Sequence, residues 1–218
     1  MQKNNNNMNK IVLGSIIATS AVILSTAGLA SQSNLRVFAS AVPSSVSISN
    51  PSFADGSVTP NNWNSISAES SSVIARIVNT NSEEFENNKE DYKLTINPGK
   101  VSSGADNNVF MINSKNIATS YGYQSNEFNL ASNGYYVISV PVRTQGTAWA
   151  SVYLTDESKD FKLKCENITA TDSYKTYTFY VATQTEALNV SLQLYLGSER
   201  NISKGAVFFD EIKAYSYA

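Results

Sequence analysis

The side chains with which this chain could act on another molecule are aromatic rings and amides rather than acid–base pairs. Its 218 residues include no histidine and a single cysteine, Cys165. Without histidine the chain has no Ser–His or Cys–His nucleophilic pair, no histidine-ligated zinc, and no side chain whose ordinary pKa lies near neutrality. A lone cysteine forms no disulfide within the chain and is most often a small buried hydrophobic residue. These features disfavour most classes of enzyme.

Aromatic residues recur at a spacing that would place them on one face of a β-strand. Trp149 and Tyr153 are four residues apart, and at about 3.3 Å per residue their rings would lie about 13 Å apart on the same side. Further residues with outward parity on their own strands are Tyr135, Arg143, Tyr180, Gln193 and Tyr195. If these strands share a sheet, the seven side chains form one surface of rings and amides.

The strands that must position these side chains are indicated by period-two alternation with Gly, Asn, Ser and Asp between the runs. In the clearest run, 188–196, a leucine or valine stands at every second position. The runs 134–143, 148–155 and 174–181 alternate in the same way, and shorter strands are expected around 46–48, 73–78, 93–96, 109–112 and 128–130. No helical period extends beyond two turns, and the acidic run 79–91 is expected to be a solvated loop. The pattern predicts an all-β fold, a single antiparallel β-sandwich.

Two places break the regular alternation. Pro141 interrupts a strand run, and because proline cannot donate to a ladder it predicts a sheet edge or a bulge. In the last strand, Val207 and Phe209 have the parity opposite to that of Ile212 and Ala214. The inward face therefore switches at residues 210–211, which predicts a bulge there.

Composition and charge exclude two further classes of protein, fully disordered chains and nucleic-acid-binding proteins. The chain is 42% hydrophobic, 11% aromatic and 16% charged, an apolar content too high for a fully disordered chain. The formal net charge is −2, so there is no basic field to hold nucleic acid.

The first 39 residues have the layout of a secretory signal peptide, with a helical apolar segment. Lys3 and Lys10 lie in a polar start, residues 11–29 form an uncharged and mostly apolar run, and small residues offer cleavage near Ala39 or Ala41. The alternative is an uncleaved membrane anchor, because this run is just long enough to span a bilayer. Cleavage predicts a secreted, extracellular protein with no stable membrane insertion, and residues 44–218 as its domain.

Three segments resemble the jelly-roll carbohydrate-binding modules of the galactose-binding-like family, as found in secreted bacterial proteins. They are 48–56 with Trp63 soon after, 121–139, and 205–212. The resemblance covers most of residues 44–216 and implies a jelly-roll sandwich that stacks sugars on aromatic side chains. A pyranose has an apolar C–H face that suits a ring, and its hydroxyls suit amides and hydroxyls. Arg143 could clamp an acidic sugar.

The resemblance also implies a structural calcium between the first and last strands. The bulge at residues 210–211 would turn Asp210 aside toward a loop that contains Asp55, and carboxylate and carbonyl oxygens are the ligands that calcium prefers. Where relatives commonly have Phe-Glu, this chain has Phe53-Ala54. Asp55 could replace the missing ligand, or the site could be empty, with Asp210 solvated or capping backbone.

The function expected from these features is non-catalytic binding of a polysaccharide or glycan, alone or beside a partner enzyme or a cell surface. The alternative is an adhesive or protein-interaction sandwich. A jelly-roll lyase or glycosidase is less favoured, because the adjacent Asp156 and Glu157 have the composition of a turn rather than of a catalytic pair.

Overall fold

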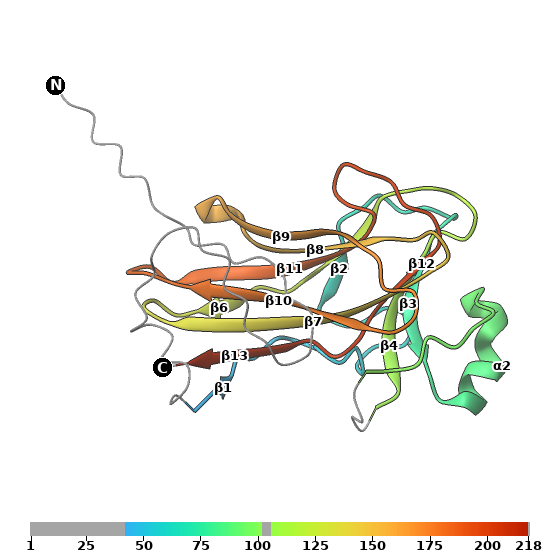
Figure 1. The fold of residues 1–218 in the computed structure, drawn as a ribbon, viewed down its shortest axis with the longest axis horizontal. Coiled ribbons are helices and arrows are strands. Elements are labelled where there is room, and N and C mark those ends of the chain that lie inside the picture. The colour runs from blue at the N-terminus through green and yellow to red at the C-terminus, as the bar shows by residue number, and fades with distance from the viewer. Residues whose placement is uncertain (1–41, 102–105, 218) are drawn as a thin grey trace.

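A computed structural model describes residues 42–101 and 106–217. Within these residues, two antiparallel sheets face one another around a common core, with one helix at one end of the sandwich (Figure 1). The predicted all-β sandwich is therefore confirmed. The predicted signal peptide and its helix lie outside the described residues. Within the described ranges, no helix has the length and apolar character needed to cross a membrane.

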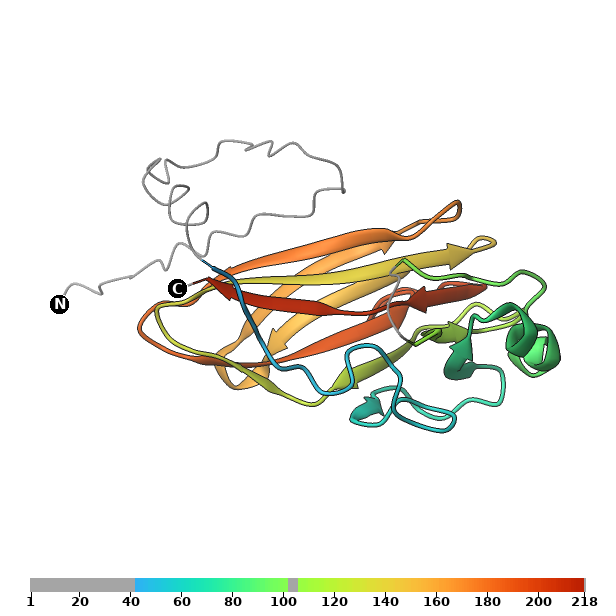
Figure 2. The ribbon, with the colours of Figure 1, turned by 90° about the horizontal axis from the view of Figure 1, so that it is seen from below.

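The larger sheet has seven strands in the order β1-β13-β7-β12-β4-β3, with β10 paired to β7. Its strands are β1 (Ser44–Ser45), β3 (Ile74–Asn79), β4 (Asn108–Asn113), β7 (Tyr135–Gln145), β10 (Lys175–Ala182), β12 (Ala206–Phe209) and β13 (Lys213–Tyr217). Figure 2 shows the orange β10, the yellow β7 and the dark red β13 running side by side.

The smaller sheet has six strands in the order β2-β5-β11-β8-β9, with β6 paired to β11. Its strands are β2 (Trp63–Ser65), β5 (Tyr121–Ser125), β6 (Phe128–Leu130), β8 (Ala150–Asp156), β9 (Phe161–Ile168) and β11 (Leu188–Leu196). A 3-10 turn, η1 (Glu157–Lys159), connects β8 to β9.

The core between the sheets is made by the inward side of each alternating strand. Ile138 and Val140 on β7 meet Val152 on β8 and Leu192 and Leu194 on β11, and all five are fully buried. The inward parity predicted for these strands is confirmed, because a strand with one buried face keeps its apolar residues on that face.

The loop expected over 79–91 is wrong, because helix α2 (Ser82–Tyr92) occupies most of it. Asn81 caps the helix by accepting a hydrogen bond from the Glu83 backbone N–H, at 3.1 Å. Glu83 and Glu84 lie in the first turn, where carboxylates interact favourably with the helix dipole. Phe85 and Tyr92, seven residues apart, are buried in a second apolar cluster against the larger sheet. Two apolar residues thus anchor a helix whose composition is otherwise that of a loop.

The strand expected around 93–96 is also wrong. Lys93 adopts a left-handed conformation, with φ of 54°, and its N–H donates to the Glu90 carbonyl, which ends α2. Residues 94–96 then continue without strand structure.

The bulge predicted at residues 210–211 is confirmed by the register of the neighbouring strand. Phe209 pairs with Val142 and Lys213 pairs with Ser139, so the three residues 210–212 lie opposite the two residues 140–141 of β7. Pro141 lies opposite this interruption, and its carbonyl accepts from the Asp210 N–H. The nitrogen of Pro141 faces the same side, so its missing donor falls where the ladder is already broken.

Candidate binding surface

The seven residues predicted to form one surface lie on the outer faces of two different sheets. Tyr153, Gln193 and Tyr195 lie on the six-stranded sheet, with Trp149 just before β8. Tyr135, Arg143 and Tyr180 lie on the seven-stranded sheet. The single surface was expected if the strands shared a sheet, and they do not.

The outer face of the six-stranded sheet is closed around Tyr153, which is only 1% exposed. The ring of Tyr195 meets the Tyr153 ring edge-on, with centroids 5.5 Å apart. The ammonium of Lys162 lies 4.5 Å from the centroid of the Tyr153 ring, and the Tyr153 hydroxyl donates to Glu166 Oε1 at 2.7 Å. The expectation that Trp149 and Tyr153 present two open rings is thus corrected for Tyr153, whose ring is covered by its neighbours.

Burial on this face changes the acidity of both tyrosines. Burial, and then the hydrogen bond to Glu166, raises the pKa of Tyr153 to about 12. Burial, and then the nearby Glu199 carboxylate, raises the pKa of Tyr195 to about 12. Glu199 also forms an ion pair with Lys162, so the residues after β11 help to hold the Lys162 ammonium over the Tyr153 ring.

The other two predicted residues of this face are held by polar contacts. Gln193 is buried, and its Nε2 donates to Gln124 Oε1 at 2.8 Å. Trp149 is half-buried and its backbone is fixed at both ends: its N–H donates to Ser203 Oγ, and its carbonyl accepts from the Gly197 N–H.

The outer face of the seven-stranded sheet carries a group of tyrosines that remain partly exposed. Val137 on β7 pairs with Tyr180 of β10 on one side and with Tyr215 of β13 on the other. In the next row Tyr135 pairs with Tyr217. We call Tyr135, Tyr180, Tyr215 and Tyr217 the tyrosine face. Tyr180 is 48% exposed and the other three are half-buried.

Strand order, rather than sequence proximity, creates the tyrosine face. Tyr215 and Tyr217 follow the bulge, and they point outward because Ala214 between them and the bulge points into the core. Neither Tyr215 nor Tyr217 was predicted as a site residue from the sequence, although the predicted change of parity after Phe209 indicates that both face outward. Because adjacent strands lie about 4.8 Å apart, Tyr180 and Tyr215 on either side of β7 are about 10 Å apart.

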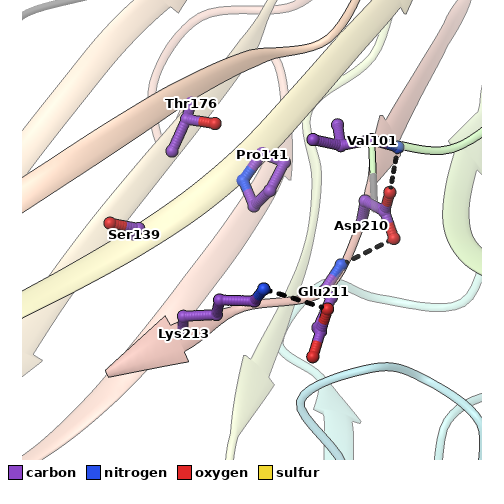
Figure 3. Close-up of a pocket in the computed structure, with 7 residues that line it drawn as sticks. All are labelled: Val101, Ser139, Pro141, Thr176, Asp210, Glu211 and Lys213. Carbon is purple, nitrogen blue, oxygen red and sulfur yellow. Dashed lines mark hydrogen bonds and ion pairs between the residues drawn. The ribbon is translucent and has the colours of Figure 1, made fainter. Parts of the chain in front are cut away.

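Polar side chains continue the same outer face beyond the tyrosines. Ser139 on β7 pairs with Thr178 and with Lys213, and the Ser139 and Thr178 hydroxyls are hydrogen-bonded at 3.1 Å. Next to them is a cavity of about 120 Å³, drawn in Figure 3. Its lining residues are Val101, Ser139, Pro141, Thr176, Asp210, Glu211 and Lys213.

Asp210 at this cavity is fully buried, and backbone groups take up its carboxylate. Oδ2 accepts from the Val101 N–H at 2.6 Å, and Oδ1 accepts from the Glu211 N–H at 2.7 Å (Figure 3). Asp210 thereby fastens the segment 97–101 to the bulge.

The predicted calcium ligands are therefore engaged in other contacts. Oδ1 of Asp55 accepts from Asn61 Nδ2 at 3.1 Å, and the side-chain amide of Asn50 donates to the Asp55 and Asn61 carbonyls. Among the described residues, no group of three or more Cys, Asp or Glu side chains is placed to hold a metal. Calcium at Asp55 and Asp210 stays a prediction.

The carboxylate considered for catalysis, Asp156, serves a turn. It is buried, with Oδ1 accepting from Ser158 Oγ and Oδ2 from the Asn189 N–H. Burial alone would raise the pKa of Asp156, but these hydrogen bonds outweigh it and lower the pKa below its ordinary value. Such a group stays ionised near neutrality and does not act as a general acid there.

Solved structures similar to this chain share little of its sequence. The Stig cyclase FisC from Fischerella sp. TAU, in complex with an indole compound, has a TM-score of 0.55 and 14% identity over 80% of this chain and 98% of the cyclase. An arabinose-bound α-L-arabinofuranosidase has a TM-score of 0.50 and 11% identity, over 79% of this chain but 26% of the enzyme. A carbohydrate-binding module, TmCBM61 with β-1,4-galactotriose, has a TM-score of 0.47 and 14% identity over 78% of this chain.

No protein-family model and no curated protein matches the chain. At these identities the structural likeness concerns the fold alone. The chain has a β-sandwich fold that occurs both in a cyclase and within a glycoside-cleaving enzyme. A shared fold does not fix the ligand, which depends on the side chains of the surface of this chain.

Proposed function

We propose that this chain is a secreted, non-catalytic module that binds a polysaccharide or glycan on the tyrosine face. One observation carries the proposal: four tyrosines from three neighbouring strands lie on one outer face, around Val137. The apolar C–H face of a pyranose stacks on such rings, and a phenol hydroxyl is a group with which sugar hydroxyls form hydrogen bonds.

The row next to the rings supplies polar partners. The hydroxyls of Ser139 and Thr178 and the ammonium of Lys213 follow directly along the three strands. The rings span about 10 Å across the strands and two rows along them, roughly 7 Å, which suits one or two sugar residues. A contact of this size on an open surface predicts weak binding, because little of the ligand is desolvated.

The test is substitution of single rings on this face, Tyr180→Ala and Tyr215→Ala. Binding of the purified chain is measured on a glycan array and by affinity electrophoresis in gels with soluble polysaccharides. We expect each substitution to weaken binding about fivefold, because a lost stacking contact costs on the order of 1 kcal/mol. The control is Ile202→Ala, which removes a side chain that is 61% exposed in the loop between β11 and β12, two strands that carry none of the four tyrosines.

Two results would contradict the proposal. One is a wild-type chain that retains no glycan, which would favour the adhesive or protein-contact alternative, since tyrosines are also enriched at protein interfaces. The other is glycan binding that survives both tyrosine substitutions, which would place the sugar elsewhere on the sandwich.

A further inference from the structure

A second hollow lies on the outer side of the seven-stranded sheet, at the opposite end of β7 from the tyrosine face. Its volume is about 350 Å³, and it lies where β7 ends, β12 begins and the chain leaves α2. Its lining includes Lys93, Ile96, Arg143 and Thr171, with Gly146 at the turn after β7. We call this hollow the basic groove.

The groove is positively charged in a chain with a net negative charge. Its lining includes two cations, Lys93 and Arg143, and no Asp or Glu. Six lysines in the described residues form ion pairs with carboxylates, but neither Lys93 nor Arg143 is among the paired cations. The buried carboxylate on the same side of the sheet, Asp210, already accepts backbone N–H groups with both oxygens.

Arg143 is fixed in place and retains unused donor capacity. Its Nη1 donates to the Pro98 carbonyl, which holds the guanidinium against the segment 97–101. Its Nε is buried and has no hydrogen-bond partner among the described residues. Arg143 lines the groove, and the fork of a guanidinium matches an anionic oxygen group well.

The rest of the lining suits a molecule larger than an inorganic ion. The volume is within the range of small-molecule sites, about 300–1,000 Å³. Ile96 is 60% exposed, which leaves apolar surface at the groove. Thr171 is exposed, and a Cβ added at Gly146 would meet nothing within 4 Å, so this side of the groove is open.

We propose that the basic groove binds a small organic acid of the sugar-acid class. The carboxylate of the ligand pairs with Arg143 and Lys93, and its carbon skeleton lies on Ile96. The site is separate from the tyrosine face, because residues 97–101 lie between the two, tied to Arg143 at Pro98 and to Asp210 at Val101. The groove would add a charged subsite that a neutral glycan does not use.

Isothermal titration calorimetry with galacturonate tests this proposal. We expect saturable binding to the whole chain, at least tenfold weaker binding of neutral galactose, at least tenfold loss in Arg143→Gln and severalfold loss in Lys93→Gln. Lys164→Gln makes the same charge change at an exposed lysine on the other sheet, and we expect it to bind galacturonate like the wild type. Because Arg143→Gln removes the contact with Pro98, the exposed Lys93 variant and a thermal melt of each protein separate lost binding from lost folding.

Three results would overturn the proposal: no saturable binding of galacturonate, unchanged binding in both charge variants, or inorganic sulfate binding as tightly as galacturonate. The tyrosine face is tested independently by neutral glycans and Tyr180→Ala. Failure at one site is therefore distinguishable from failure at the other.

Discussion

The two outer faces of the sandwich start from the same alternation of apolar and outward residues, yet they end in opposite states. On the six-stranded sheet, Tyr153 and Tyr195 are 1% and 8% exposed. On the seven-stranded sheet, Tyr180 is 48% exposed, and the tyrosines beside it are half-buried.

The difference arises from what lies above each face. Lys162 and Glu199 form an ion pair beside Tyr153, and the hydroxyl of that tyrosine is tied to Glu166. On the seven-stranded sheet, α2 packs over one end, where Phe85 and Tyr92 share an apolar cluster with residues of β3, β4 and β12 that includes none of the four tyrosines. Outward parity in a strand therefore places a side chain on a face, but it does not decide whether that face is open to a ligand.

The largest expected contrast is in stability. Tyr153→Ala should lower the free energy of unfolding by about 3–5 kcal/mol, as for other large buried aromatics, whereas Tyr180→Ala should change it by no more than about 0.5 kcal/mol. Urea unfolding monitored by circular dichroism measures both values. Similar losses for the two variants would break the distinction between a closed and an open face.

The fastening of residues 97–101 is tested by Asp210→Asn. The asparagine can accept from the Val101 N–H with its oxygen, but its amide group then faces the Glu211 N–H, which loses its acceptor. We expect a loss of about 1–3 kcal/mol in unfolding free energy, the cost of an unsatisfied buried group.

The Asp210→Asn variant also tests the predicted calcium site. A thermal midpoint that falls when a chelator is added to the wild type, but not to Asp210→Asn, would assign a metal to Asp210. An unchanged midpoint in both proteins would leave Asp210 with its backbone-capping role alone.

Titration with base compares the pKa values of the tyrosines on the two outer faces. Tyr153 and Tyr195 have pKa values raised to about 12, above the ordinary value of about 10. The folded state holds these protons more tightly, so their contribution to stability is complete below pH 10 and is lost as the pH rises toward 12. We expect a late phase in the phenolate absorbance of the folded protein, reduced in Tyr153→Phe. A single early phase for all tyrosines would contradict the closed face.

The smallest effect is expected from the ion pair beside Tyr153. Both Lys162 and Glu199 are more than one-third exposed, so Glu199→Gln should lower the unfolding free energy by less than about 1 kcal/mol, and less again at high salt. Chemical denaturation at two salt concentrations measures this effect. A loss of several kcal/mol would mean that the closed state of the face depends on this single contact.

Much of the fold could be predicted because its signals are local. The alternation in β7, β8, β10 and β11 gave the inward residues, and the change of parity after Phe209 gave the bulge. Helix α2 was not predicted, because Phe85 and Tyr92 are its only buried residues. The burial of both depends on contacts with a sheet whose strands are distant in sequence. The candidate site was predicted only in part, with Tyr135 and Tyr180 selected and Tyr215 and Tyr217 missed.

The sequence by itself determined that this protein is built mostly of strands and which side of β7, β8, β10 and β11 faces the core, since a period of two depends only on neighbouring residues. Only the tertiary structure decided that β10, β7 and β13 are neighbours, which brings Tyr180 beside Tyr215, and that Lys162 covers Tyr153. These are contacts between residues far apart in the chain. Their pairing depends on how all the strands pack together, which no local pattern of residues specifies.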